Sequence, residues 1–145
     1  MVPNAYQIVA ACLALVLVTF VVGARLLFTR VKEMRQKRIH PQAASTSLQM
    51  SARLENVQAA DNFRNLFEVP VLFYALAAVA LATSHVPGWL VSGAWLYVAL
   101  RILHSLIHCT YNRVMHRFAI FLLSFVLLVG LWMAFFLTLH APSAS

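Results

Sequence analysis

The sequence is short of charge, and of acidic charge above all. Only 10% of its 145 residues are charged, with four Asp and Glu against eleven Lys and Arg. About a quarter of the residues are charged in a typical soluble domain, so this chain is not expected to fold in water. Hydrophobic residues make up 62% of it instead. The composition therefore favours a protein embedded in a lipid bilayer.

Cysteine is also scarce. Cys12 and Cys109 lie in or near apolar segments, with neither CxxC spacing nor a companion His at zinc-finger spacing. No disulfide and no zinc site is predicted.

The net charge of +7 could indicate nucleic-acid binding. The basic residues cluster between apolar segments without a recognised nucleic-acid-binding fold, so no nucleic-acid partner is expected.

Four apolar stretches are long enough to matter. The first, residues 5–24, carries no charge and could cross the roughly 30 Å hydrocarbon layer as a helix. A cleavable signal peptide is the alternative, but no Lys or Arg precedes the run, and Arg25 follows it instead of a small-residue cleavage site. We expect an all-α integral membrane bundle forming a single domain, residues 1–145, with spanning helices at about 5–28, 55–84, 88–111 and 117–140.

The basic residues predict the topology. All but Arg101 lie between the first and second spans or between the third and fourth. By the positive-inside rule both termini are outside and both basic loops are cytoplasmic. Short loops and the absence of targeting signals fit a bacterial membrane as well as any other, and in a bacterium the plasma membrane is expected. Within the first basic loop, residues 40–52 are small and polar and are predicted to be a mobile loop.

A polar stripe leads into the second span. The apolar part of this span, residues 69–83, would reach only about 22 Å, so it must draw in residues from its N-terminal side. Asp61, Arg64, Asn65 and Glu68 have the spacing that places side chains on one helix face. Pro70 has no N–H to donate and predicts a bend where the stripe ends.

A second polar face lies on the third span, where Arg101, His104, His108 and Tyr111 are spaced by three, four and three residues. Arg101 is near the middle of its helix, where an unpaired cation costs at least about 3 kcal/mol. Glu68 is the one carboxylate expected at that depth, so the two are predicted to face each other. The pair could equally serve only to hold helices together.

Several donors are expected to meet at the cytoplasmic end of the bundle: Arg64, Asn65, His104, His108, Arg113 and Arg117. Such a pocket suits a small polyanion like glutathione, and a guanidinium could lower the pKa of its thiol. Metal binding by His104 and His108 is the alternative. There is no HExxH motif and no second Glu-x-x-His, so no metal site is predicted.

Two motifs, RNLFEVPVLF at 64–73 and RILHSLIHCTYNRVMHR at 101–117, resemble the MAPEG family, the membrane-associated proteins of eicosanoid and glutathione metabolism. The resemblance extends over nearly the whole chain. It implies a homotrimer of four-helix bundles, with glutathione as co-substrate bound between neighbouring subunits near the cytoplasmic side.

Carried over to this sequence, the resemblance implies that Arg64, Asn65, Glu68 and His104 bind glutathione, and that Arg101 is the family's intramembrane arginine. Arg117 resembles the arginine that stabilises the thiolate and is the predicted catalytic residue. A basic residue at the end of the first helix, Lys32 or Arg35, would also contact glutathione. His108 completes the predicted set.

The sequence departs from the family pattern at four positions. Asp61 replaces an arginine found in many relatives, and His108 replaces a common tyrosine. Phe118 and Phe121 occupy places where the prostaglandin E synthase branch has a serine and a tyrosine. The isomerase chemistry of that branch is therefore not expected. The loss of one cation and two hydroxyls is consistent with weaker glutathione affinity, with a different thiol, or with no ligand.

The predicted function is a glutathione transferase or glutathione-dependent peroxidase that acts on hydrophobic electrophiles dissolved in the membrane, a detoxifying role. Two other hypotheses stay open. The chain could be a non-catalytic lipid-binding or scaffold protein of the same family, or it could provide a proton or ion pathway through Glu68, Arg101 and the histidines.

Overall fold

The computed structural model describes residues 3–40, 42, 46–55 and 58–140, and all regular elements in these ranges are helices. Four stretches are long and apolar enough to cross a membrane: Pro3–Gln36, Gln58–Ala82, Gly88–Cys109 and Val114–Leu139. For the described residues, the prediction of an all-α fold with four spanning segments is confirmed.

The first helix, α1 (Pro3–Gln36), continues well beyond the predicted end at residue 28. Its 34 residues rise about 51 Å, more than the hydrocarbon layer requires, so its basic end extends past the apolar run. Lys37 pairs with Glu33 and with Glu55, each at 2.8 Å. Hydrogen bonds to Glu33 and Glu55 raise the pKa of Lys37, and the contacts hold the last turn of α1 against the following segment.

The connection after α1 contains a short helix, α2 (Ser47–Arg53), where a loop was predicted. Its start is a capping box: the Thr46 hydroxyl accepts from the backbone N–H of Gln49, whose side chain accepts from the Thr46 backbone. The loop prediction is therefore wrong for residues 47–52. The rest of that prediction falls partly on residues 41 and 43–45, which lie outside the described residues.

The second span is broken as predicted. It consists of α3 (Gln58–Glu68) and α4 (Pro70–Ala82), with Val69 between them. Pro70 cannot donate a hydrogen bond to the preceding turn, and its fixed φ suits the first position of a new helix. The polar stripe thus ends where α3 ends.

The last two helices are α5 (Gly88–Cys109) and α6 (Val114–His140). Two tight turns use left-handed backbone conformations, at Ser84 with φ 54° before α5 and at Asn112 with φ 46° before α6. Asn tolerates this conformation better than most residues. Asn112 is thereby fixed directly beside the start of α6.

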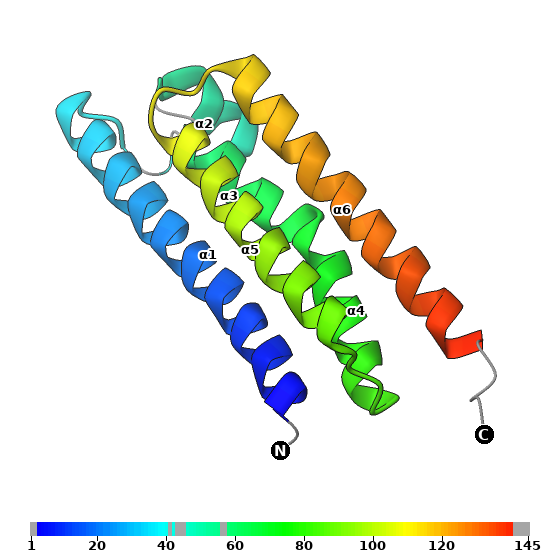
Figure 1. Ribbon diagram of the computed structural model, residues 1–145. Helices are drawn as coiled ribbons and strands as arrows, with labels where there is room; N and C mark the ends of the chain where they lie inside the picture. The colour runs from blue at the N-terminus through cyan, green and yellow to red at the C-terminus, as the bar shows by residue number, and fades with distance from the viewer. Residues whose placement is uncertain (1–2, 41, 43–45, 56–57, 141–145) are drawn as a thin grey trace.

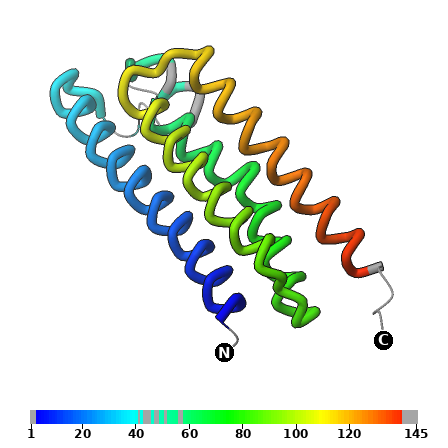
Figure 2. Tube along the Cα trace, viewed as in Figure 1, coloured from blue at the N-terminus to red at the C-terminus, as the bar shows by residue number. Residues whose placement is uncertain are grey.

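The helices form an elongated bundle in which α5 packs against α1, α3 and α6 (Figure 1). The chain trace in Figure 2 shows both described ends at one end of the bundle, while α2 and the α5–α6 turn lie at the opposite end. We call these the terminus end and the loop end. Both basic connections share the loop end, as the topology prediction requires; which side of the membrane it faces stays a prediction.

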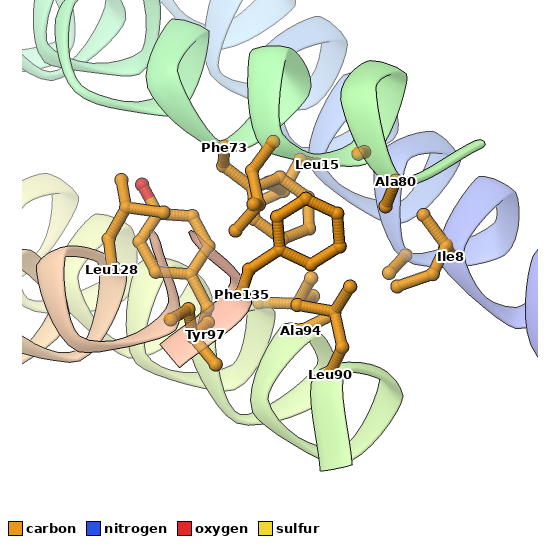
Figure 3. Close-up of a cluster of buried hydrophobic side chains, with 14 residues drawn as sticks. Ile8, Leu15, Phe73, Ala80, Leu90, Ala94, Tyr97, Leu128 and Phe135 are labelled. Carbon is orange, nitrogen blue, oxygen red and sulfur yellow. The ribbon is translucent and has the colours of Figure 1, made fainter. Parts of the chain in front are cut away.

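The main hydrophobic core fills the half of the bundle toward the terminus end. Figure 3 shows Phe73, Tyr97 and Phe135 at its centre, with Ile8 and Ala80 toward one side. The rings of Phe73 and Tyr97 stack with centroids 4.9 Å apart. Gly93 lets α5 and α6 approach closely, because a Cβ at this position would lie 2.3 Å from Leu131 Cδ2. The loop half contains the polar residues instead.

Candidate functional site

Arg101 is fully buried in the centre of the bundle, with no exposed surface. Its Nη2 donates to the backbone carbonyl of Asn65 at 3.0 Å, and its Nη1 lies 3.5 Å from Ser124 Oγ. The guanidinium also lies over the rings of Phe121, at 5.5 Å, and Tyr97, at 5.9 Å. Neutral dipoles and aromatic faces therefore hold this cation between α3, α5 and α6.

One helical turn closer to the loop end, His104 and His108 are buried side by side, with ring centroids 5.6 Å apart. Arg117 of α6 contacts both. Its backbone carbonyl lies 3.3 Å from His104 Nδ1, and its Nη1 lies 2.9 Å from His108 Nε2 and 3.0 Å from Asn112 Oδ1. We call Arg101, His104, His108, Asn112 and Arg117 the polar cluster.

The partners of the two histidines determine where one proton of each ring lies. A guanidinium can only donate, so Nε2 of His108 accepts from Arg117, the ring proton of His108 sits on Nδ1, and this ring is neutral. A carbonyl can only accept, so Nδ1 of His104 carries a proton and donates to Arg117. Each ring keeps one nitrogen that Arg117 does not engage, Nδ1 of His108 and Nε2 of His104.

Among the described residues, these atoms have no hydrogen-bond partner: His108 Nδ1, His104 Nε2, Arg101 Nε and the Tyr97 hydroxyl. Leaving a buried polar atom unpaired usually costs about 1–3 kcal/mol. Four such atoms lie along one face of α5, which makes this part of the bundle a candidate site for a polar ligand.

A further buried polar residue, Asn62, was not singled out by the sequence pattern. It has no exposed surface; its Oδ1 accepts from Ser105 Oγ at 3.4 Å, and its Nδ2 donates to Cys109 Sγ at 3.4 Å. Asn62 follows Asp61, the first member of the predicted stripe, and faces another direction. A hydrophobic period on α3 that places Asn62 with Ala59 and Leu66 could have revealed it.

The predicted stripe on α3 faces outward in the single chain. Asp61, Arg64 and Glu68 are exposed, and Asn65 is half-buried, reaching the cluster through its backbone carbonyl. The predicted direct pairing of Glu68 with Arg101 is not formed, since no ion pair joins them among the described residues, although Glu68 lies close enough to interact electrostatically with the guanidinium. The reason is geometric: Arg101 points toward Asn65 and Ser124, whereas Glu68 ends α3 on its outer face.

Other predicted donors also lie apart from the polar cluster. Arg113 and Tyr111 are exposed, and the Tyr111 hydroxyl lies 3.3 Å from His116 Nδ1. Arg35 is exposed near the end of α1, and in Figure 1 α1 and α6 lie on opposite sides of the bundle. The predicted set therefore divides into two groups. The joined group comprises Arg101, His104, His108, Arg117 and, through its backbone carbonyl, Asn65; the exposed group comprises Arg35, Arg64, Glu68 and Arg113.

In the described part of the chain, no three His, Cys, Asp or Glu side chains gather closely enough to hold a metal ion. The Nε2 of His108 and the Nδ1 of His104 are both engaged by Arg117, so the rings are oriented by an arginine.

Four apolar spans enclosing a polar cluster at one end define an integral, multi-pass membrane protein with a candidate site for a polar ligand. Comparison with family models makes this specific: the model of the MAPEG family matches residues 8–137. The match covers nearly the whole chain, and the chain belongs to this family. No curated protein and no solved structure matches it.

Proposed function

We propose that the chain is a membrane-bound glutathione transferase or glutathione-dependent peroxidase acting on hydrophobic electrophiles. Its family includes enzymes of this kind. The observation that carries the proposal is the state of Arg117: a half-buried guanidinium fixed by Asn112 and His108, with no carboxylate partner among the described residues. An oriented cation without a counter-ion suits an anionic sulfur.

The unpaired atoms of the polar cluster fit glutathione in kind. His108 Nδ1 and Arg101 Nε are donors suited to carboxylate or amide oxygens, and His104 Nε2 is a ring nitrogen available to a polar group of the ligand. Glutathione carries two carboxylates, two amides and an ammonium group. The exposed Arg64, Asn65 and Glu68 would hold its outer portion, with the carboxylate of Glu68 matched to the ammonium group.

Within this proposal glutathione supplies the sulfur nucleophile. Arg117 stabilises the thiolate and keeps it at the loop end of the spans, while Asn112 and His108 prevent the guanidinium from turning toward bulk water. In a transferase reaction, the sulfur forms a bond to an electrophilic carbon as the leaving group departs with its electron pair. Since His108 accepts from Arg117 and is therefore neutral, Arg117 is the cation assigned to the developing charge.

The proposal also includes a homotrimer. Arg35 lies on α1 and Arg117 on α6, two helices on opposite sides of the bundle (Figure 1), so α1 of a neighbouring subunit would have to provide this contact. Both termini outside, with both basic loops cytoplasmic, would place the polar cluster where glutathione is available. In a bacterium the membrane would be the plasma membrane.

Conjugation of glutathione to chlorodinitrobenzene tests the proposal. Arg117→Ala should lower kcat by about 10²–10³-fold, the usual effect of removing one electrostatic donor, and should abolish the thiolate absorbance of the glutathione complex. Arg53→Ala removes an exposed arginine of α2 and serves as the matched control, with activity unchanged. Equal activity of both variants would contradict the role of Arg117.

A non-catalytic lipid-binding or scaffold role is the second candidate. It is favoured by an open groove of about 510 Å³ between α1 and the α3–α4 span, lined by apolar residues such as Phe20, Phe63 and Tyr74. Under this alternative glutathione would not bind. A rise in the thermal unfolding temperature on adding glutathione would therefore favour the enzyme over the scaffold.

A further inference from the structure

A second groove runs along the opposite side of α1, between α1 and α5. Its volume is about 380 Å³, and one face of each helix lines it. From α1 come Leu17, Val18, Val21, Val22 and Arg25, and from α5 and the residue after it come Ile102, Ser105, Leu106, Cys109 and Thr110. Eight helical residues correspond to about 12 Å, so the groove follows the helices inward from the loop end.

The groove has a single charged residue, Arg25, and it stands at one end. The preceding run of residues 5–24 carries no charge, so Arg25 marks the level where the hydrocarbon layer gives way to headgroups. The remaining polar side chains are engaged inside the protein: Ser105 donates to Asn62, and Thr110 donates to the carbonyl of Leu106. An occupant of the groove would therefore meet apolar walls and one guanidinium.

Arg25 is exposed and retains free donors. One Nη2–H donates to the carbonyl of Cys109, which caps the last turn of α5. A guanidinium has five N–H donors, so most remain available. Among the residues that the structure describes, Arg25 forms no ion pair, and no carboxylate lines the groove. The charge is therefore uncompensated at headgroup depth.

We propose that the α1–α5 groove binds one anionic phospholipid of the surrounding membrane, with an acyl chain between the two helices and the phosphate on Arg25. The occupant follows from the setting: both helices are spanning segments, so an open apolar groove between them faces acyl chains. Charge complementarity selects an anionic headgroup over a zwitterionic one. The site is separate from the polar cluster and holds whether or not the chain uses glutathione.

The groove between α1 and the α3–α4 span provides an internal comparison. It is larger, at about 510 Å³, yet no charged residue lines it. Acyl chains would occupy it without regard to headgroup. Selection among lipids should therefore depend on Arg25 alone and not on groove volume.

The test is native mass spectrometry of the full-length protein in maltoside micelles with equal dioleoyl phosphatidylglycerol and dioleoyl phosphatidylcholine. The wild-type protein should retain phosphatidylglycerol in roughly fivefold preference over phosphatidylcholine, the effect of one interfacial arginine. Arg25→Gln should abolish this preference. Arg30→Gln removes the same charge from the same helix outside the groove and should keep it. Equal loss in the two variants would overturn the site.

Two further variants separate binding from folding. Arg25→Lys keeps the cation and should retain most of the preference, even if loss of the cap on Cys109 weakens the protein. Val21→Trp fills the groove from a position that is 69% exposed, leaves Arg25 intact, and should release the bound lipid. Unchanged lipid retention in Val21→Trp would overturn the groove as the binding surface.

The same spectra distinguish other occupants. If the groove were covered by a second copy of the chain, Val21→Trp would change the mass of the oligomer while leaving lipid retention alone, which would refute the proposal. Glycerol phosphate, which has the headgroup chemistry without acyl chains, should not displace the lipid at equal concentration. Displacement would show that Arg25 binds phosphate without the groove.

Discussion

Two polar stripes of similar spacing, one on α3 and one on α5, have opposite positions in the bundle. The α3 stripe exposes Asp61, Arg64 and Glu68, whereas Arg101, His104 and His108 on α5 are buried. The difference follows from the neighbours of each helix. The α5 helix packs against α1, α3 and α6, so its polar face meets other helices, while the stripe on α3 lies on a side that the single chain leaves open.

The largest expected effect tests whether burial gives the α5 stripe a structural role that the α3 stripe lacks. Arg101→Ala should lower the free energy of unfolding by about 3–5 kcal/mol, because it removes the largest fully buried side chain and leaves a cavity. Arg64→Ala, on the exposed stripe, should change it by no more than about 0.5 kcal/mol. Unfolding in mixed detergent–dodecyl sulfate micelles, followed by circular dichroism, measures both.

A volume-conserving variant sharpens the interpretation. Arg101→Met restores much of the packing without the charge and should recover at least half of the loss seen in Arg101→Ala. A loss of equal size in the two variants would mean that the hydrogen bond to Asn65 and the contacts with aromatic rings, rather than packing, hold the helices together.

A smaller effect separates adjacent residues on α3. Asn62→Ala removes the partner of Ser105 inside the bundle and should cost about 1–3 kcal/mol. Asp61→Ala, one position earlier and exposed, should change the free energy of unfolding by no more than about 0.5 kcal/mol. The same unfolding measurement compares the two variants. A larger effect for Asp61→Ala than for Asn62→Ala would contradict the structure and would mean that the predicted stripe, which begins at Asp61, is the buried face of α3.

The smallest effect on stability is expected for Glu68→Gln. Glu68 is exposed, so the free energy of unfolding should change by less than about 0.5 kcal/mol. Under the proposed function, however, losing a charge-assisted hydrogen bond should weaken glutathione binding about tenfold. Titration of the thermal shift with glutathione measures this, and unaltered binding would remove Glu68 from the site while leaving Arg117 to be judged on its own.

Sequence reasoning could predict the four spans, because long apolar runs have few structural alternatives in a membrane. It could predict the break at Pro70, which follows from a missing N–H. It also grouped Arg101, His104 and His108 correctly, since spacing determines which residues share a helix face.

The direction of each face was harder to predict. Glu68 was assigned to Arg101 because a buried cation usually requires an acid, but carbonyl oxygens and aromatic rings serve this cation instead. Asn62 was missed because its burial depends on Ser105 and Cys109, which are more than forty positions away in the chain. α2 was missed because a capping box can start a short helix in a polar segment.

The terminus end of the bundle is fastened without charge. The side chain of Asn4 donates to the carbonyl of Val86, and the indole of Trp95 donates to Gln7. The loop end uses arginine and lysine contacts instead. Dissolved ions screen exposed charges but leave neutral hydrogen bonds nearly unaffected. High ionic strength should therefore weaken the ion pairs of Lys37 with Glu33 and Glu55 at the loop end, while the neutral hydrogen bonds at the terminus end stay nearly unchanged.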